Sequence, residues 1–201
     1  MNLYIKIKNK LNNILNKNTR QLYIHFLKIT KRSDFIRWSK QESLFPSWEG
    51  RTILLSKQIK PNSIVLEFGA ANRFLKKYLP ENCTYLHSDL VKRNEETIVI
   101  DLNKEILDFP ISNYMVFSGV LEYIFDVKLI IKHCSKYTDH LLFSYATFDK
   151  FPNINNRRYN GWVSDMKEFE FIKLADEINF EIKIIGFWKE QTLYLLTKVN
   201  K

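Results

Sequence analysis

The sequence predicts an α/β protein with a doubly wound parallel sheet and a basic helical extension at its N-terminus. From Ser63 onward, short apolar runs alternate with amphipathic segments, which is the pattern of strands and helices in a sheet covered on both faces. Residues 1–50 are instead rich in lysine and asparagine. We therefore expect a helical extension at 1–50 and one globular domain at 51–201.

The apolar runs give the expected strands of the domain. Five precede the C-terminal part of the chain, at 63–68, 83–88, 97–100, 114–118 and 140–145. A long helix is expected at 121–137, with these residues facing the core: Leu121, Ile124, Leu129, Ile130 and Cys134. A loop should follow at 147–162, and then a helix at 164–179 with Ser164 as its N-cap. Two final strands are expected at 180–188 and 191–198, joined by a tight turn.

The chain is organised around the stretch SIVLEFGAANR, residues 63–73. Its apolar part reads as a strand buried on both faces, and Gly69 directly follows. Glycine allows a sharp turn and a close approach of a ligand to the backbone. Apolar residues then recur at helical spacing until Pro80. A strand, a tight turn and a helix in this order open a nucleotide-binding α/β unit.

Three acids stand where expected strands end, namely Glu67, Asp89 and Asp101. Ligands of open α/β sheets bind outside the carboxyl ends of the strands, and a carboxylate there can accept hydrogen bonds from both hydroxyls of a ribose. Asp89 follows Gly69 by 20 residues, the separation expected of a ribose-binding acid. The alternative is that these acids cap the helices that follow.

The motifs VLEFGA, LHSDL, VIDLN and FSGVLEYI resemble the successive motifs of class I S-adenosylmethionine-dependent methyltransferases. The chain is most similar to small bacterial methyltransferase-domain proteins of the methionine-biosynthesis-W and ubiquinone-biosynthesis-G types, over residues 48–198. The resemblance implies a Rossmann-like sheet of seven strands whose last strand is antiparallel. The expected hairpin of 180–188 and 191–198 matches that ending.

The resemblance also implies S-adenosylmethionine as the cofactor and a set of residues around it. These are Glu67, Gly69, Ala70, Ala71, Asn72, Asp89, Asp101, Leu102, Ser118, Gly119 and Leu121. One feature departs from the family pattern, because two of the three glycines of the turn are missing. Alanine at a position that needs positive φ costs on the order of 1–2 kcal/mol. Such a turn either binds the cofactor more weakly or belongs to a scaffold that has lost it.

A methyl transfer to oxygen benefits from a base near the acceptor, and the candidates are Glu122, His87 and Tyr145. Two of them have a structural alternative: Glu122 as a helix cap, and His87 as a buried, hydrogen-bonded histidine. Tyr123 takes the place where relatives often carry histidine. The two cysteines, Cys83 and Cys134, fit no metal-ligand spacing, so no metal is expected.

The expected loop at 147–162 holds a cluster of charged and aromatic residues, of which Arg157, Arg158, Asn160 and Trp162 are candidates for binding the acceptor. Arginine recognises phosphate and carboxylate groups through paired N–H groups, and tryptophan stacks on sugar rings. This pattern favours a phosphorylated or acidic glycan. The alternative is a loop held in place by its own arginines.

The extension carries the net charge of the chain. Residues 1–40 contain ten lysines and arginines and one acid, a balance of +9, so the remainder is neutral. Residues 1–32 read as an amphipathic helix, either lying on anionic lipid or packing its apolar stripe on the domain or on a second subunit. Trp38 and Trp48 form either a lid over a ligand or a clasp between extension and domain. No run of about 18 apolar residues is present, so no transmembrane helix is expected.

Together these features favour a methyltransferase acting on a sugar or glycan-type acceptor, a small-molecule substrate. Similarity to proteins of bacterial surface-polysaccharide synthesis implies that role. A non-catalytic interaction protein and an RNA methyltransferase with a basic arm are the alternatives. The neutral domain argues against a nucleic-acid partner. We expect a cytoplasmic protein, with peripheral contact at the inner membrane face through residues 1–32.

Overall fold

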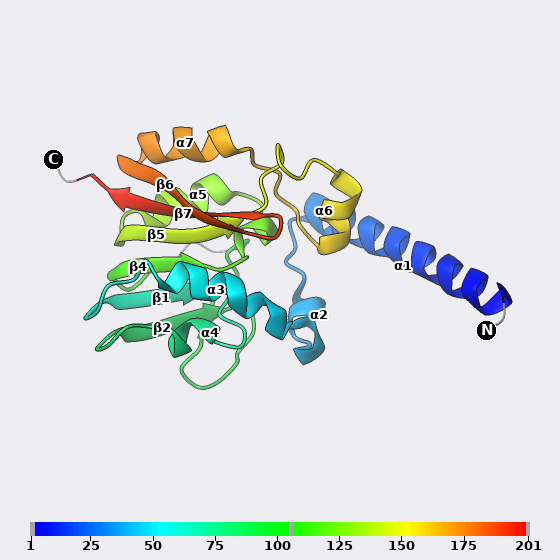
Figure 1. The fold of residues 1–201 in the computed structure, drawn as a ribbon, viewed down its shortest axis with the longest axis horizontal. Coiled ribbons are helices and arrows are strands. Elements are labelled where there is room, and N and C mark those ends of the chain that lie inside the picture. The colour runs from blue at the N-terminus through cyan, green and yellow to red at the C-terminus, as the bar shows by residue number, and fades with distance from the viewer. Residues whose placement is uncertain (1–2, 105–106, 200–201) are drawn as a thin grey trace.

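A computed structural model describes residues 3–104 and 107–199, with side chains from residue 16 onward. Its centre is a seven-stranded sheet of order β3-β2-β1-β4-β5-β7-β6 (Figure 1). The strands are β1 (Ile64–Phe68), β2 (Thr84–Asp89), β3 (Ile98–Val99), β4 (Ser112–Phe117), β5 (Thr138–Tyr145), β6 (Phe180–Trp188) and β7 (Gln191–Lys198). Neighbouring strands from β3 to β5 pair in parallel, and β7 runs antiparallel to both β5 and β6. The expected Rossmann-like sheet with one antiparallel strand is confirmed.

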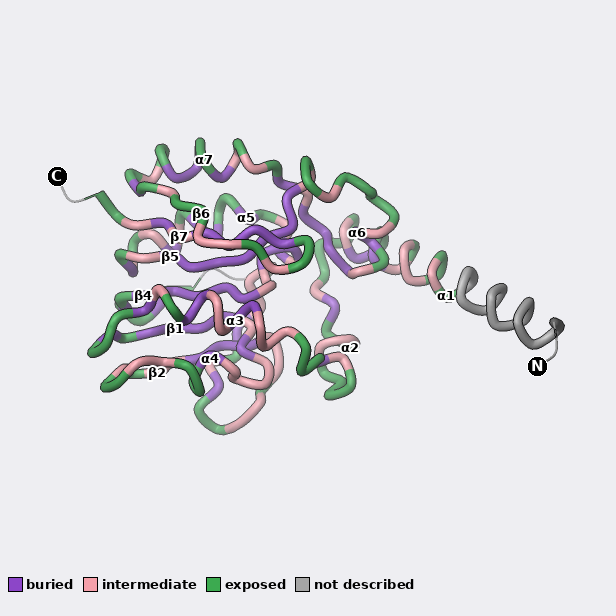
Figure 2. Tube along the Cα trace, in the orientation of Figure 1, coloured by how far each residue is buried: buried purple, intermediate pink, exposed green. Residues whose placement is uncertain are grey.

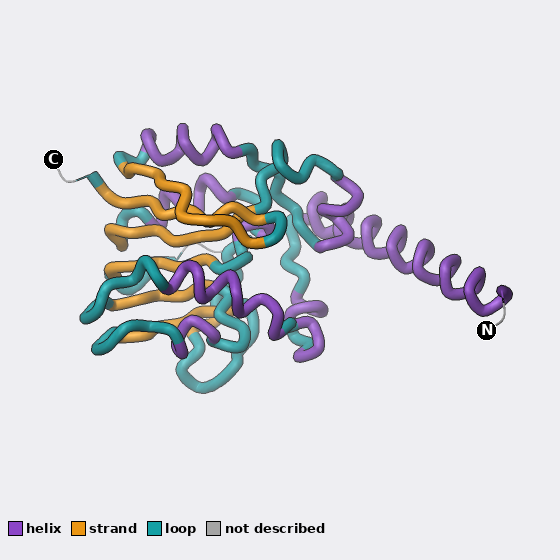
Figure 3. The backbone as a smooth tube through the Cα atoms, in the orientation of Figure 1, coloured by secondary structure: helices purple, strands orange, loops and turns teal. Residues whose placement is uncertain are grey.

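Helices cover both faces of this sheet (Figure 3). The helices are α1 (Leu3–Thr30), α2 (Phe35–Trp38), α3 (Glu49–Ser56), α4 (Phe74–Lys77), α5 (Val127–Cys134), α6 (Ile154–Asn160) and α7 (Glu168–Glu177), with 3-10 turns η1 (Gln41–Ser43), η2 (Pro46–Trp48) and η3 (Leu121–Tyr123). Successive residues of a strand point to opposite faces, so β1 sends Leu66 and Phe68 into the core under α5 and α7. Val65 points the other way, into the core under α3 and α4. Figure 2 shows β1, β4 and β5 largely buried between these layers.

The strands lie within two residues of the bounds expected from the sequence. The hairpin of β6 and β7 begins and ends where it was predicted. The largest differences are in β4 and β5, which begin at Ser112 and Thr138 rather than at 114 and 140. Buried apolar runs flanked by polar residues therefore located every strand of the sheet.

The predicted long helix at 121–137 is wrong. The chain instead forms the single turn η3 and then α5, whose N-cap Asp126 accepts a hydrogen bond from the backbone N–H of Leu129. This cap starts a new helix, which does not continue the helical phase of residues 121–123. Leu129 is therefore 47% exposed rather than buried. Leu121, Ile124, Ile130 and Cys134 do face the core.

The helix predicted at 164–179 begins later, at Glu168, and Ser164 is not its N-cap. Glu170 accepts a hydrogen bond from the backbone N–H of Lys167, which closes the first turn. Ser164 is buried, and its hydroxyl donates to the carbonyl of Leu121 and accepts from the hydroxyl of Tyr145. The stretch expected as a loop at 147–162 contains α6.

The N-terminal extension begins with α1, which projects away from the sheet (Figure 1). Its second half reaches the domain, because Ile24 and Leu27 are buried and pack against Val163. No helix within the described ranges is long and apolar enough to cross a membrane. The boundary at residue 50 expected from the sequence falls in α3, which already packs on the sheet.

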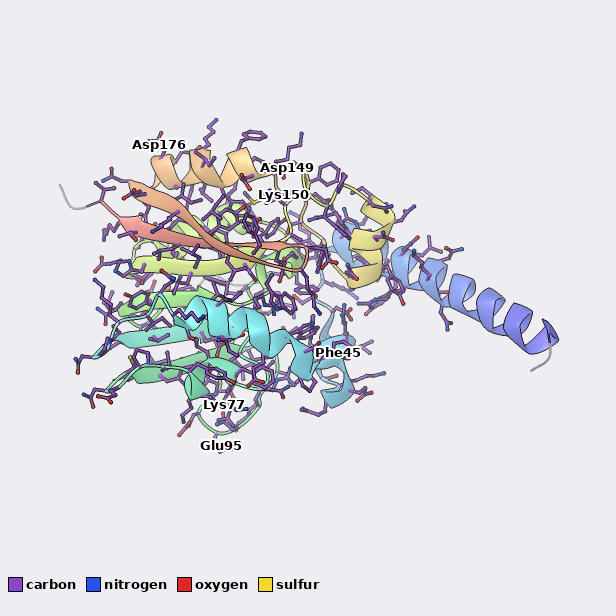
Figure 4. The ribbon with its side chains drawn as sticks, in the orientation of Figure 1. Phe45, Lys77, Glu95, Asp149, Lys150 and Asp176 are labelled. Carbon is purple, nitrogen blue, oxygen red and sulfur yellow. The ribbon has the colours of Figure 1, made fainter. Side chains whose placement is uncertain are left out.

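The cap of α5 gives a test of the fold. Asp126→Ala should lower the free energy of unfolding by about 1 kcal/mol, because the N–H of Leu129 loses its acceptor. Urea denaturation followed by circular dichroism measures this. Asp176→Ala is the control, since Asp176 is exposed near the end of α7 (Figure 4) and caps no helix start. Equal stability of the two variants would contradict the capping role.

Candidate functional site

A cavity lies at the carboxyl ends of β1, β2, β3 and β4, and it encloses about 1090 Å³ of space, its open mouth included. Most of the residues expected around a cofactor line it: Glu67, Gly69, Ala70, Ala71, Asn72, Asp89, Asp101, Leu102, Ser118 and Gly119. Leu121 does not, because its side chain is fully buried in the core below.

Strand register brings these residues together. Phe68 at the end of β1 lies opposite Ser88 of β2 and Phe117 of β4. Asp89, the last residue of β2, lies opposite Val99 of β3. The parallel strands thus end at one level, and the residues that follow them share one edge of the sheet.

The turn after β1 keeps the expected path although two glycines are absent. Gly69 has φ +61°, and a Cβ there would lie 2.6 Å from Cγ2 of Val120. Ala71 and Arg73 also adopt the left-handed region, with φ values of 46° and 54°. The strain predicted from the sequence for a turn with alanine in place of glycine is therefore present in the backbone.

Asp89 holds this turn. Its Oδ2 accepts a hydrogen bond of 2.8 Å from the backbone N–H of Ala71, and its Oδ1 accepts one from the N–H of Val91. Arg93 adds an ion pair of 3.2 Å to Oδ1. The carboxylate therefore fixes the turn and also forms part of the cavity wall.

Glu67 is the acid at the base of the cavity. Burial raises the pKa of its carboxyl to about 8, a hydrogen bond from the hydroxyl of Tyr85 opposes that rise, and the nearby charge of Asp89 adds to it. Burial thus favours the neutral form of this carboxyl, and the charge of Arg51 opposes that effect.

Arg51 of α3 also lines the cavity, and the sequence patterns did not single it out. Its Nε donates to Oγ of Ser118 and its Nη2 to the carbonyl of Ser118, at 3.0 and 2.9 Å, while Nη1 donates to Oε1 of Gln191. A Cβ on Gly119 would lie 2.1 Å from Nη1, so only glycine fits beside this guanidinium. Burial lowers the pKa of Arg51, and the charge of Glu122 opposes that change.

Residues 31–48, here called the covering segment, close over the cavity. The hydroxyl of Ser33 donates to Oδ1 of Asp101 at 2.6 Å, and Nη2 of Arg93 donates to the carbonyl of Trp38 at 2.7 Å. Trp38 and Trp48 both line the cavity, with ring centroids 6.1 Å apart. Of the two alternatives for these tryptophans, this arrangement favours the lid.

Further aromatic rings extend the wall formed by the covering segment. The ring of Trp38 meets that of Tyr123 edge to face at 4.9 Å, and Phe45 meets Trp48 in the same way at 5.1 Å. Phe45 is labelled in Figure 4, close to α2. The cavity thus has one acidic wall, provided by the sheet, and one aromatic wall, provided largely by the covering segment.

None of the three predicted catalytic candidates lines the cavity. Oε1 of Glu122 accepts hydrogen bonds from the N–H of Ala146 and from Nε2 of Gln191, inside the core. Tyr145 is buried, and its hydroxyl donates to Ser164. Nε2 of His87 lies 3.0 Å from Oδ1 of Asn94. The structure therefore corrects these assignments, because all three side chains are used within the protein.

The acceptor role expected for Arg157 and Arg158 is also corrected. Arg157 is fully buried, and it donates to Oδ1 of Asp165 at 2.8 Å and to the carbonyls of Ala146 and Ser164 at 2.7 Å. Arg158 pairs with Asp165 as well and donates to the carbonyl of Trp162. These arginines hold their own loop, which was the alternative stated above.

The other two members of that cluster are likewise engaged. The ring of Trp162 is buried, with the guanidinium of Arg157 at 5.2 Å from its centre. The carbonyl of Asn160 accepts a hydrogen bond from Nη1 of Arg37 in the covering segment. Only Gly161 and Val163 of this region line the cavity. Among the described residues, no group of His, Cys, Asp and Glu is arranged to hold a metal.

Comparisons with known proteins agree with this architecture. No family model matches the sequence, and no curated protein sequence matches it. Among solved structures, a chain of the complex between the Haloferax volcanii Trm112 methyltransferase activator and a putative methyltransferase is similar over 84% of this chain and 99% of its own, with a TM-score of 0.65 and 9% identity. The plantazolicin methyltransferase BpumL, solved with S-adenosylhomocysteine, is similar over 90% and 100%, with a TM-score of 0.59 and 11% identity.

A third similar structure is CalO1, a methyltransferase of calicheamicin biosynthesis, also solved with S-adenosylhomocysteine. It matches 76% of this chain with a TM-score of 0.57 and 13% identity, and this chain spans about half of its length, 54%. The chain therefore has the class I S-adenosylmethionine-dependent methyltransferase fold, which confirms the expectation from the motifs. At these identities the similarity establishes the fold, and activity is argued separately below.

The arginine network predicts a pH dependence of stability. Partial burial raises the pKa of the Asp165 carboxyl, but hydrogen bonds from Arg158, Lys28 and Arg157 outweigh that effect. The pKa is lowered from 3.8 to about 2. A carboxyl whose pKa is lowered by folding stabilises the folded state above its unfolded pKa, and that contribution disappears as the pH falls towards 2. The stability gap between wild type and Asp165→Asn should narrow by about 2 kcal/mol from pH 5 to pH 2 in urea titrations. A constant gap would contradict the assignment.

Proposed function

We propose that this protein is an S-adenosylmethionine-dependent methyltransferase. One observation carries the proposal: the turn after β1 and the acids at the carboxyl ends of β1, β2 and β3 line a single cavity at this edge of the sheet. Two of the similar structures were solved with the demethylated cofactor product, which supports the same ligand here.

The residues present fit that cofactor. Asp89 and Asp101 offer carboxylate oxygens to the hydroxyls and the base of the adenosine, and Leu102 offers an apolar side chain. Arg51 uses three of its five N–H groups within the protein and keeps two for the carboxylate of the amino-acid part. Glu67 would regain its negative charge beside a bound cation, because an opposite charge lowers the pKa of a carboxyl.

The bound cofactor supplies an electrophilic methyl group on a sulfonium. The chain's own contribution is to orient the acceptor and to exclude water. The covering segment and Tyr123 supply the aromatic wall for this purpose. Because none of the predicted acid–base candidates reaches the cavity, we propose that the reaction proceeds mainly by positioning the acceptor nucleophile in line with the methyl group.

The acceptor we propose is a sugar or glycan-type molecule of bacterial surface-polysaccharide synthesis. The aromatic wall supports this proposal, since Trp and Tyr rings pack on the faces of sugar rings. Arg32, which lines the cavity, is suited to an acidic or phosphorylated group on that acceptor. We also propose a cytoplasmic location with peripheral membrane contact through residues 1–32, and its surface is derived in the next subsection.

Isothermal titration calorimetry with S-adenosylmethionine and S-adenosylhomocysteine tests the proposal. We expect both ligands to bind. Absence of heat at millimolar ligand would leave the alternative of a non-catalytic scaffold. The hydrogen bond from Ser33 to Asp101 and the ion pair of Arg93 with Asp89 would then be internal contacts of that scaffold. Transfer of a labelled methyl group to glycan, RNA or small-molecule fractions would identify the acceptor, and label in RNA would contradict the glycan assignment.

Asp89 provides the sharpest mutational test of the cofactor site. Asp89→Ala should weaken binding of S-adenosylhomocysteine by about 1.5–3 kcal/mol, roughly 10- to 150-fold, because charged hydrogen bonds are lost. Asp139→Ala on exposed residue 139 of β5 is the matched control and should bind as the wild type does. Thermal unfolding of both variants checks that the turn held by Asp89 is still folded. Unchanged affinity in Asp89→Ala would overturn the ribose assignment.

A further inference from the structure

Helix α1 has two apolar faces, and only one of them is used by the fold. Ile24 and Leu27 are buried, and they pack against the region around Val163. Leu22, Phe26 and Ile29, spaced by four and three residues, are 71%, 51% and 77% exposed. Residues at this spacing share one side of a helix. These three side chains therefore do not form the contact of α1 with the domain, because a different face of the helix does so.

The chain after α1 exposes two further apolar side chains. Asp34, the N-cap of α2, accepts hydrogen bonds from Nη2 of Arg20 and from the hydroxyl of Tyr23, so α2 begins against α1. Phe35 and Ile36 follow immediately, and they are 54% and 63% exposed. Soluble proteins rarely expose large apolar side chains together without a partner. We call Leu22, Phe26 and Ile29 the outer face of the extension.

Charge indicates which partner fits the outer face. Residues 1–40 carry a balance of +9, whereas the rest of the chain is neutral. The one acid of that stretch, Asp34, is itself neutralised by Arg20. Lysine-rich helices with an apolar face lie in the interface of anionic bilayers, with the apolar side chains between the lipid chains and the cations near the headgroups.

We propose that the outer face docks on the surface of an anionic lipid bilayer. α1 projects from the domain (Figure 1), so the sheet and its helices do not block that contact. This proposal specifies the peripheral contact included in the proposed function, and it does not depend on methyl transfer.

Docking would bring the cavity to the lipid surface. The inward side of α1 contributes Leu27 to the cavity wall, and the residues that follow α1, Arg32 to Asp34, also line it. One short stretch of chain thus carries the outer face and part of the cavity mouth. An acceptor attached to a lipid would meet the cavity without leaving the membrane surface.

Co-sedimentation of the full chain with vesicles tests the docking. We expect binding to vesicles of phosphatidylglycerol and phosphatidylcholine in equal parts, at least tenfold weaker binding to pure phosphatidylcholine, and weakening at high salt. The triple variant Leu22→Ser, Phe26→Ser, Ile29→Ser should lose at least tenfold in vesicle affinity. The control Phe169→Ser, Ile172→Ser, Phe187→Ser removes three side chains of similar exposure on α7 and β6, and it should bind as the wild type does.

Other results would overturn the proposal. Equal vesicle binding by both triple variants would show that the outer face is not the docking surface. Equal binding of the wild type to anionic and to pure phosphatidylcholine vesicles would show that the partner is not an anionic bilayer. Analytical ultracentrifugation gives the oligomeric state of both proteins. A dimeric wild type and a monomeric Leu22/Phe26/Ile29 variant would show that a second copy of the chain covers this face instead. Calorimetry with S-adenosylhomocysteine on the same variant keeps the two proposals separate, because its cavity should still bind that ligand.

Discussion

Parallel, in-register pairing of β1 with β2 and β4 is the constraint on which the site depends. It aligns Phe68 with Ser88 and Phe117, so three chains leave the sheet at one level. The turn at Gly69, the carboxylate of Asp89 and the Ser118–Gly119 segment then face a common space. A shift of one residue between two strands would send the side chains of one strand to the opposite face of the sheet and move one of these groups away.

Local patterns in the sequence predicted the features that local chemistry decides. Apolar runs located the strands, and the separation of Gly69 and Asp89 placed both at one cavity. Arg51 was not found, because its partners Ser118 and Gln191 lie 67 and 140 residues away in the chain. Arg157 was misread for a different reason: its partners are close in the chain, but an arginine that binds carbonyls of its own loop has the same sequence signature as one that binds a phosphate.

The turn after β1 shows how a strained backbone is kept without glycine. Left-handed φ angles at Ala71 and Arg73 cost on the order of 1–2 kcal/mol each. The N–H of Ala71 donates to the carboxylate of Asp89, and hydrogen bonds to a charged group contribute about 1.5–3 kcal/mol. The backbone strain and the charged hydrogen bond are of similar size, so Asp89 can hold a turn that the local sequence disfavours.

The covering segment has a consequence for the kinetics of any ligand that uses the acidic wall. Ser33 occupies one oxygen of Asp101, and Arg93 joins Asp89 to the carbonyl of Trp38. An incoming ligand must exchange these internal bonds for its own, so part of its intrinsic affinity is cancelled by the loss of the bonds it replaces. The same competition speeds departure, because Ser33 and Arg93 are ready to reoccupy the oxygens as a ligand leaves. Residence time would then be shorter than the number of polar contacts in the cavity suggests.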